Sequence, residues 1–266
     1  MIVVTWGAAT DTGRVRARNE DSFLAQAPLF VVADGMGGHA GGAVASRLAV
    51  DVLRETLDRS PITTAGMKTT LQAANDAIIA AAHADPAAPL MGTTAVGLVL
   101  FTEADAEQWL AFNIGDSRIY RLRDGLLSQI SVDHSYVHDL VLAGLLDPQS
   151  ARTHPERSVI TRALGIERVP VPDFWAFPAV DGERFLLCSD GLSGELGDPQ
   201  ITQILTAASD PLEAARELVT AANTAGGRDN ITAIVVDTTG SSQDDATGSS
   251  QDDVAGASQD DVAGAT

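Results

Sequence analysis

Residues 29–35 read LFVVADG, an apolar run that ends in an aspartate and a glycine. Aspartates follow two further apolar runs, since WLAFNIG (109–115) precedes Asp116 and RFLLCS (184–189) precedes Asp190, and Asp190 is again followed by a glycine. Apolar, β-branched runs of this length predict strands. Because a strand in a sheet holds its terminal side chain rigidly, the aspartates that follow are candidate metal ligands. Taken singly, an Asp-Gly pair is also typical of a plain turn.

The segments around these runs predict the fold class. Nine strands are predicted, at residues 2–10, 22–26, 29–35, 93–101, 108–115, 117–123, 171–177, 184–190 and 230–237. Four segments have helical character, at residues 43–57, 67–82, 135–151 and 211–225. Many strands in hairpin-like succession, with helices clustered between them, indicate an antiparallel α+β fold rather than alternating βαβ units.

The end of the chain has a different composition. From residue 241 it repeats SSQDDATG, SSQDDVAG and ASQDDVAG, without aromatic or basic residues. So little apolar surface cannot offset the entropy of ordering, which predicts a disordered acidic tail over 240–266 after a folded domain over 1–239. The spacing of its paired aspartates matches no calcium-binding loop.

Composition limits the compartment and the partners. Hydrophobic residues make up 45% and charged residues 20%, as in ordinary globular proteins. No apolar run is long enough to cross a bilayer, the N-terminal residues do not have the order of a signal peptide, and the single Cys188 cannot form an intrachain disulfide. We therefore expect a cytoplasmic protein, and a monomer because no heptad or repeat interface is evident. The net charge of −19 argues against nucleic acid and anionic membranes as partners, since both need a basic surface.

The types of candidate ligand predict which metal would bind. Asp229, in the loop GGRDN, adds a fourth carboxylate before the last strand. Oxygen ligands without a histidine or cysteine cluster favour Mg²⁺ or Mn²⁺ over zinc. The dispersed His83, His134 and His138 are interpreted as surface or capping residues. Two divalent ions that share a carboxylate can hold a hydroxide and present it to phosphorus for in-line attack.

Residues 13–21, GRVRARNED, carry three arginines before a polar, acidic loop. The planar guanidinium of arginine can bind two phosphate oxygens at once. A solvated turn with a charged rim is the alternative interpretation of this segment alone.

Six motifs in succession resemble the PPM family, the type 2C metal-dependent protein phosphatases, over residues 4–236. They are GRVRARNEDS, VVADGMGGHAGG, MGTTAV, FNIGDSRIYRL, LLCSDGL and GGRDNITAIVV. The resemblance implies a β-sandwich of two antiparallel sheets flanked by helices on both sides, in four αββα layers. It also implies a dinuclear Mn²⁺ or Mg²⁺ site in a cleft at one end of the sandwich.

The resemblance assigns a role to each acidic residue. Asp34 would bridge both metal ions, and the main-chain carbonyl of Gly35 would contact the second ion. Asp190 and Asp229 would bind the first ion. Asp116 matches the position that helps to hold a third, weaker ion in bacterial members.

The resemblance also assigns the residues around the ions. Arg16 would bind the substrate phosphate, so that Arg16 and Asp34 are the expected catalytic residues. Glu20 and Asp21 would act through metal-bound water and hydrogen bonds to the ligands. Independently of the resemblance, the position of Asn230 directly after Asp229 indicates that it could cap or pin this turn.

The resemblance also covers His154 and residues 158–165, which begin at Ser158. These residues correspond to the flap segment of bacterial members, which is associated with substrate access. Some eukaryotic relatives have a histidine, assigned as general acid, two residues after the bridging aspartate, whereas this chain has Met36. Protonation of the leaving group is therefore unassigned, with a metal-bound water or His39 as candidates.

The predicted activity is hydrolysis of phosphoserine and phosphothreonine in proteins by a metal-bridged hydroxide. Its expected partners are phosphorylated proteins, including serine/threonine kinases and their targets. A cysteine-nucleophile phosphatase is the first alternative, but Cys188 lies in an apolar strand rather than in a loop of backbone amides. The second alternative is a non-catalytic phosphoprotein-binding scaffold, against which the full set of acidic residues and Arg16 counts.

Overall fold

The computed structural model describes residues 1–37, 41–58, 62–85 and 90–240, so His39 and residues 241–266 of the predicted tail lie outside the described residues. The helical elements in these ranges are α1 (Gly41–Arg54), the 3-10 helix η1 (Glu55–Asp58), α2 (Thr64–Ala84), α3 (Tyr136–Leu142), α4 (Pro148–Ala151), α5 (Asp190–Ser193), α6 (Asp198–Ala207) and α7 (Pro211–Ala225). The strands are β1 (Ile2–Asp11), β2 (Ser22–Gln26), β3 (Leu29–Ala33), β4 (Gly35–Gly37), β5 (Met91–Thr93), β6 (Ala95–Glu103), β7 (Ala106–Ile114), β8 (Arg118–Arg123), β9 (Leu126–Gln129), β10 (Asp173–Pro178), β11 (Arg184–Cys188) and β12 (Ile231–Gly240). Among the described helices, none combines the length and apolarity that crossing a bilayer requires.

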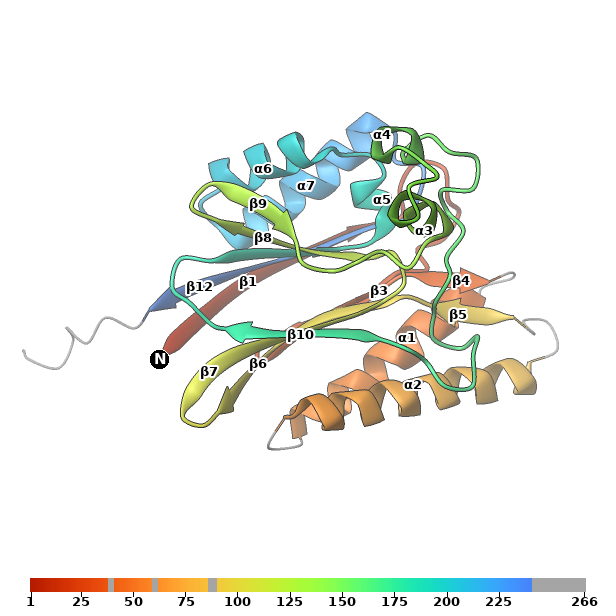
Figure 1. The fold of residues 1–266 in the computed structure, drawn as a ribbon, viewed down its shortest axis with the longest axis horizontal. Coiled ribbons are helices and arrows are strands. Elements are labelled where there is room, and N and C mark those ends of the chain that lie inside the picture. The colour runs from red at the N-terminus through yellow and green to blue at the C-terminus, as the bar shows by residue number, and fades with distance from the viewer. Residues whose placement is uncertain (38–40, 59–61, 86–89, 241–266) are drawn as a thin grey trace, which may run out of the picture.

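Two antiparallel five-stranded sheets form the centre of the molecule. Their strand orders are β1-β12-β11-β8-β9 and β10-β7-β6-β3-β2, and β4 pairs with β5 beside them. In Figure 1, α6 and α7 cover the outer face of the first sheet, and α1 and α2 cover that of the second. The predicted α+β sandwich with helices on both sides is confirmed.

Strand β3 shows why the central strands have continuous apolar sequences. Phe30 and Val32 pack between the two sheets, whereas Leu29, Val31 and Ala33 pack toward α1 and α2. Successive side chains of a strand point to opposite faces, so a strand with a core on each side buries all of them.

Two differences from the sequence-based expectation concern short elements. The helical zone predicted at 135–151 is split into α3 and α4, because Gly144 has a φ of 70° and Pro148 begins the second helix. The hairpin of β8 and β9 is not among the predicted elements. Its signal is the pair Asp124 and Gly125, whose φ values of 51° and 75° suit a tight two-residue turn.

The strand registers bring the aspartate-bearing turns to one end of the sandwich. In the first sheet, Cys188 at the end of β11 pairs with Arg118 and Ala233 near the starts of β8 and β12. In the second sheet, β6 begins beside the ends of β3 and β7. The chain passes from β7 in one sheet to β8 in the other, and this crossing also lies at that end.

Candidate metal centre

Asp34 follows β3 and is fixed through its main chain. Its N–H donates to Thr94 Oγ1 at 2.9 Å, and its carbonyl accepts from Thr93 Oγ1 at 2.8 Å and from Thr94 N at 2.9 Å. These three bonds tie the main chain of Asp34 to the end of β5 and to the residue that follows it. The carboxylate direction is thus set by the fold itself.

Gly35 sits where three segments meet. A Cβ at this position would lie 2.2 Å from the carbonyl oxygen of Gly42 and 2.5 Å from that of Glu20. Such distances exclude any side chain, so glycine is required for the close approach of β4, the first turn of α1 and the N-terminal loop. The role of the Gly35 carbonyl as a metal ligand stays a prediction.

Asp190 and Asp229 are brought together by tight backbone packing. A Cβ on Gly191 would lie 1.9 Å from the carbonyl oxygen of Asn230, so α5 lies directly against the turn before β12. Asp190 is also close enough to Asp34 for their side chains to share a hydrogen bond. Residues far apart in the sequence therefore meet at one site.

The gathered carboxylates repel one another in a poorly solvated place. Burial, and then the charges of neighbouring aspartates, raise the pKa of Asp34 and Asp116 well above the ordinary range. Burial and the charge of Asp229 raise the pKa of Asp190, and burial raises the pKa of Asp21 to about 7. These raised pKa values mean that the site holds too little positive charge to stabilise the ionised form of its aspartates.

This donor set fits divalent cations. Within the described ranges, Asp21 Oδ1 and Asp116 Oδ1 are buried without a hydrogen-bond partner, and every donor is a hard oxygen of the kind that Mg²⁺ and Mn²⁺ prefer. However, no three carboxylate, histidine or cysteine side chains of the described chain already converge as a ligand cluster. At Asp229, both carboxylate oxygens already have protein partners, since Oδ1 accepts from the N–H of Asn230 and Oδ2 accepts from Arg16.

Arg16 reaches this group from the N-terminal loop. Its NH2 donates to Asp229 Oδ2 at 2.7 Å, and this hydrogen bond raises the pKa of Arg16. Its side chain is 54% exposed, so the guanidinium also faces solvent, where a phosphate could approach.

Two other predicted residues support the site through hydrogen bonds. Asn230 donates from Nδ2 to the carbonyls of Thr12 and Arg18 and accepts at Oδ1 from the N–H of Glu20, which pins the loop that carries Arg16. The Asp21 carboxylate accepts at Oδ2 from two hydroxyls at the ends of β11 and β12.

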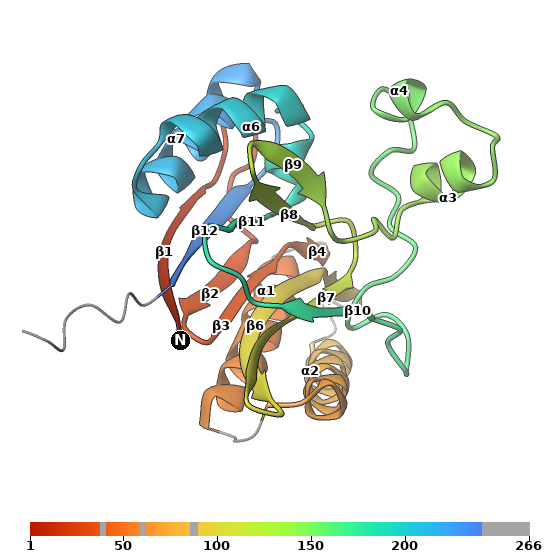
Figure 2. The same cartoon turned by 60° about the vertical axis from the view of Figure 1, so that its left-hand side comes forward.

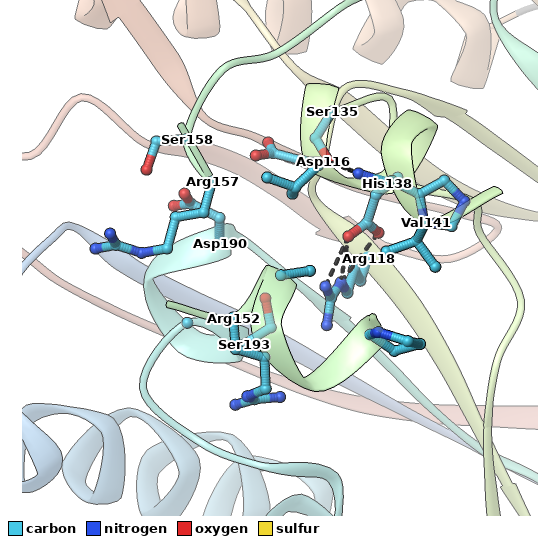
Figure 3. Close-up of a pocket in the computed structure, with 15 residues that line it drawn as sticks. Asp116, Arg118, Ser135, His138, Val141, Arg152, Arg157, Ser158, Asp190 and Ser193 are labelled. Atoms are coloured by element: carbon cyan, nitrogen blue, oxygen red, sulfur yellow. Dashed lines mark hydrogen bonds and ion pairs between the residues drawn. The ribbon is translucent and has the colours of Figure 1, made fainter. Parts of the chain in front are cut away.

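The segment between β9 and β10 projects from the sandwich and carries α3 and α4 (Figure 2). Between it and the acidic residues lies a cavity of about 270 Å³, shown in Figure 3. Ser158 lines this cavity and a smaller neighbour of about 80 Å³, and so does Asp190. His154 lines neither of the two; its Nδ1 accepts from the N–H of Glu156 instead.

The sequence interpretation missed several residues near the site. Arg118 lies within a quoted motif without an assigned role, and it binds Asp133 at 2.6 Å on the cavity floor. His134 is interpreted from sequence as a surface or capping residue; the surface interpretation is wrong because only 4% of it is exposed, and its ring is hydrogen-bonded to Gly115 and Asp173. Arg152 and Arg157 line the cavity from a segment without a recognisable pattern.

Cys188 is fully buried at the end of β11, on the face packed by α5, α6 and α7. Burial raises the pKa of its thiol to about 12. A thiol that is neither accessible nor ionised cannot serve as a nucleophile, so the structure argues against a cysteine phosphatase.

Comparisons with known proteins agree on one family. A family model described as Protein phosphatase 2C matches residues 13–226. The serine/threonine protein phosphatase PstP of Mycobacterium tuberculosis is 41% identical over 238 residues, which are 89% of this chain and 45% of that protein. The serine/threonine phosphatase stp of Listeria monocytogenes is 36% identical over 239 residues, which are 86% of this chain and 93% of that protein. The chain thus spans less than half the length of the mycobacterial relative.

Solved structures show the same similarity. The crystal structure of Mycobacterium tuberculosis PstP/Ppp superposes with a TM-score of 0.82 at 40% identity, covering 89% of this chain and 99% of that one. The catalytic domain of PstP in complex with two manganese ions also gives a TM-score of 0.82, at 38% identity, covering 90% of this chain and 100% of that one.

Proposed function

This chain belongs to the protein phosphatase 2C family, and we propose that it hydrolyses phosphoserine and phosphothreonine in proteins at a dinuclear Mn²⁺ or Mg²⁺ centre. The observation that carries the proposal is that the turns bearing Asp34, Asp116, Asp190 and Asp229 lie at one end of the sandwich, with raised pKa values for the first three. A related catalytic domain is known in complex with two manganese ions, which supports the same metal here.

The proposed roles follow from the positions of the side chains. Asp34 would bridge the two ions, with Asp190 and Asp229 on the first and the Gly35 carbonyl on the second, and Asp116 would serve a weaker third ion. Bound ions would supply Lewis-acid activation of water and would offset the charge of the phosphate. Arg16 would orient the phosphate through two parallel N–H bonds.

The supporting residues keep this arrangement in place. Asp21 and Glu20 would bind the waters around the ions, and Asn230 would hold the loop of Arg16. Ser158 and His154 both belong to the projecting segment. Of the two, Ser158 is the better-placed substrate contact because it lines the cavity. We propose phosphorylated proteins as partners and the cytoplasm as the compartment.

The proposal is tested with phosphopeptides of one sequence that differ only in phosphoserine, phosphothreonine or phosphotyrosine. With Mn²⁺ present, the protein should release phosphate from the first two in preference to the third, and chelation should abolish release. Full activity in chelator would exclude the metal-dependent reaction, and equal rates on all three peptides would exclude the serine/threonine preference.

A further inference from the structure

The cavity of about 270 Å³ borders the candidate metal centre. Its walls include Asp116 and Asp190 on the side of the acidic residues, but neither Arg16 nor Asp34 is among the residues that line it. Its volume approaches the ~300 Å³ at which pockets for small ligands begin. A substrate held at Arg16 would therefore place a neighbouring side chain, not its phosphate, in this space.

The wall formed by the projecting segment is positively charged. Arg152 and Arg157 line the cavity from this segment, as Figure 3 shows. Both are exposed, and neither has an ion pair or a side-chain hydrogen bond within the part of the chain that the structure describes. By contrast, Arg118 on the cavity floor and Arg228 in the smaller cavity are each bonded to a carboxylate.

Other exposed arginines of the described chain, such as Arg47 and Arg216, also lack an ion pair, but Arg152 and Arg157 line a cavity beside the candidate metal centre. The nearby carboxylates have other partners: Asp133 is bonded to Arg118, and Asp116 and Asp190 belong to the candidate metal centre. The pKa of Glu195 is lowered mainly by its hydrogen bond to Arg228 and to a smaller extent by the charge of Arg157. Divalent ions at the candidate metal centre would neutralise the negative charge of Asp116 and Asp190. The two arginines would then be the main charged groups of the cavity that contact a substrate.

We propose that Arg152 and Arg157 form a subsite for an anionic side chain next to the phosphorylated residue of the substrate. The ligand is a carboxylate or a second phosphate, since the guanidinium fork fits both groups. Val137 and Val141 of α3 line the same cavity and would contact the aliphatic part of that side chain. The inference rests on the proposed phosphatase activity and adds its substrate class.

The first test compares phosphothreonine peptides that differ at one flanking position, occupied by alanine, glutamate, phosphoserine or lysine. With Mn²⁺ present, kcat/KM for the glutamate peptide should exceed that for the alanine peptide by about fivefold, because two exposed ion pairs together contribute a few-fold. The kcat/KM for the phosphoserine peptide should exceed that for the alanine peptide by at least as much, and the kcat/KM for the lysine peptide should be lower than that for the alanine peptide. Equal values for all four peptides would overturn the subsite, and the glutamate and phosphoserine arms separate its two anion sources.

The second test changes the arginines themselves. In Arg152→Ala/Arg157→Ala the ratio between the glutamate and alanine peptides should fall to about one, since removing the exposed pairs removes their few-fold contribution. In Arg47→Ala/Arg216→Ala, which removes two exposed arginines from α1 and α7, the ratio should persist. Charge reversal, Arg152→Glu/Arg157→Glu, should invert the preference toward lysine, which a misfolded protein would not do. An unchanged glutamate preference in the alanine variant would overturn the proposal.

Binding of non-hydrolysable phosphonate peptides separates the subsite from catalysis. Calorimetry should show tighter binding of the glutamate peptide than of the alanine peptide to the Mn²⁺-loaded protein, with a difference that shrinks in 1 M salt as screening predicts. A binding preference without any turnover would retain the subsite and reject the proposed phosphatase function. Turnover without a preference would reject the subsite alone.

Discussion

Arg16 and Asp229 are joined by a 2.7 Å bond between the guanidinium NH2 and Oδ2 of the carboxylate. The candidate phosphate ligand is thus bonded to a candidate metal ligand. The two side chains are 54% and 33% exposed, so the bond is accessible to water and is readily exchanged. A cation that binds Asp229 must compete with Arg16 for the same oxygen, and release from Asp229 would free Arg16 for phosphate.

Replacing Arg16 by alanine should therefore affect substrate and metal in opposite directions. We expect kcat/KM for phosphopeptides to fall roughly a hundredfold, because two charge-assisted hydrogen bonds of about 1.5 kcal/mol each would be lost. Affinity for Mn²⁺ should stay equal or increase, because a positive competitor leaves. Steady-state kinetics and calorimetry measure the two effects, with the exposed Arg18→Ala on the same loop as the control. Weaker Mn²⁺ binding in Arg16→Ala would contradict the competition.

Asn230 should prove necessary for both stability and activity. It makes three side-chain hydrogen bonds that hold the loop of Arg16, so Asn230→Ala should lower the free energy of unfolding by about 2–3 kcal/mol. It should also lower kcat/KM because Arg16 loses its position. Urea denaturation and kinetics test both effects, and Asn223→Ala is a matched control because its amide oxygen has no partner among the described residues. Full kcat/KM in Asn230→Ala would disprove the positioning role.

The strand ends could be predicted from sequence because each one carries a local signal. The runs before Asp34 and Asp190 are mainly apolar, and the following glycines occupy positions where a Cβ would meet backbone atoms. Both the strand and the required glycine can therefore be predicted from a few neighbouring residues. The convergence of these ends depends on strand register, which no single segment specifies.

Other residues of the site have no local signal. Arg152 and Arg157 lie in an irregular segment, and their place beside Asp190 follows from how that segment folds back over α5. His134 is buried by β10 and the loop before Asp116, which are remote from it in sequence. Contacts of this kind are tertiary, so periodicity and spacing do not predict them.

Divalent ions should stabilise the protein through Asp34. Mn²⁺ at a hundred times its dissociation constant should add about 2.7 kcal/mol, seen as a rise in Tm. Asp34→Asn should reduce this rise, yet the metal-free variant should be at least as stable as the parent, because one of several mutually repelling buried carboxylates is gone. Thermal melts with and without Mn²⁺ provide the measurement, and exposed Asp51→Asn provides the control. An undiminished Mn²⁺ response in Asp34→Asn would rule out its role as a ligand.

Cys188 should be dispensable for turnover. Cys188→Ala should cost about 1 kcal/mol of stability, from the lost packing of a buried side chain, and should leave kcat nearly unchanged. Thiol reagents should not inactivate the native protein, because burial raises the pKa of Cys188 to about 12. Collapse of activity in a folded Cys188→Ala or Cys188→Ser variant would instead revive the cysteine-nucleophile alternative.

His134 joins the loop before Asp116 to the base of the projecting segment. Its Nδ1 accepts from the N–H of Gly115 at 3.2 Å, so the ring proton is on Nε2, which lies 3.1 Å from Asp173 Oδ2 and 3.1 Å from NH1 of Arg162. This arrangement requires the neutral ring, and burial lowers the pKa of His134 below its ordinary value of 6.5.

The lowered pKa of His134 predicts a loss of stability in acid. A histidine that is held neutral in the folded state stabilises the fold above pH 6.5, and that contribution is lost as the pH falls through the lowered folded-state pKa. Urea denaturation at pH values on both sides of 6.5 should show a steeper acid loss for the parent than for His134→Gln, which cannot acquire the charge. His83→Gln on the exposed side of α2 is the matched control and should keep the steeper loss. If His134→Gln lost stability as steeply as the parent, the acid sensitivity would have to come from other groups, and the neutral His134 bridge would not be its source.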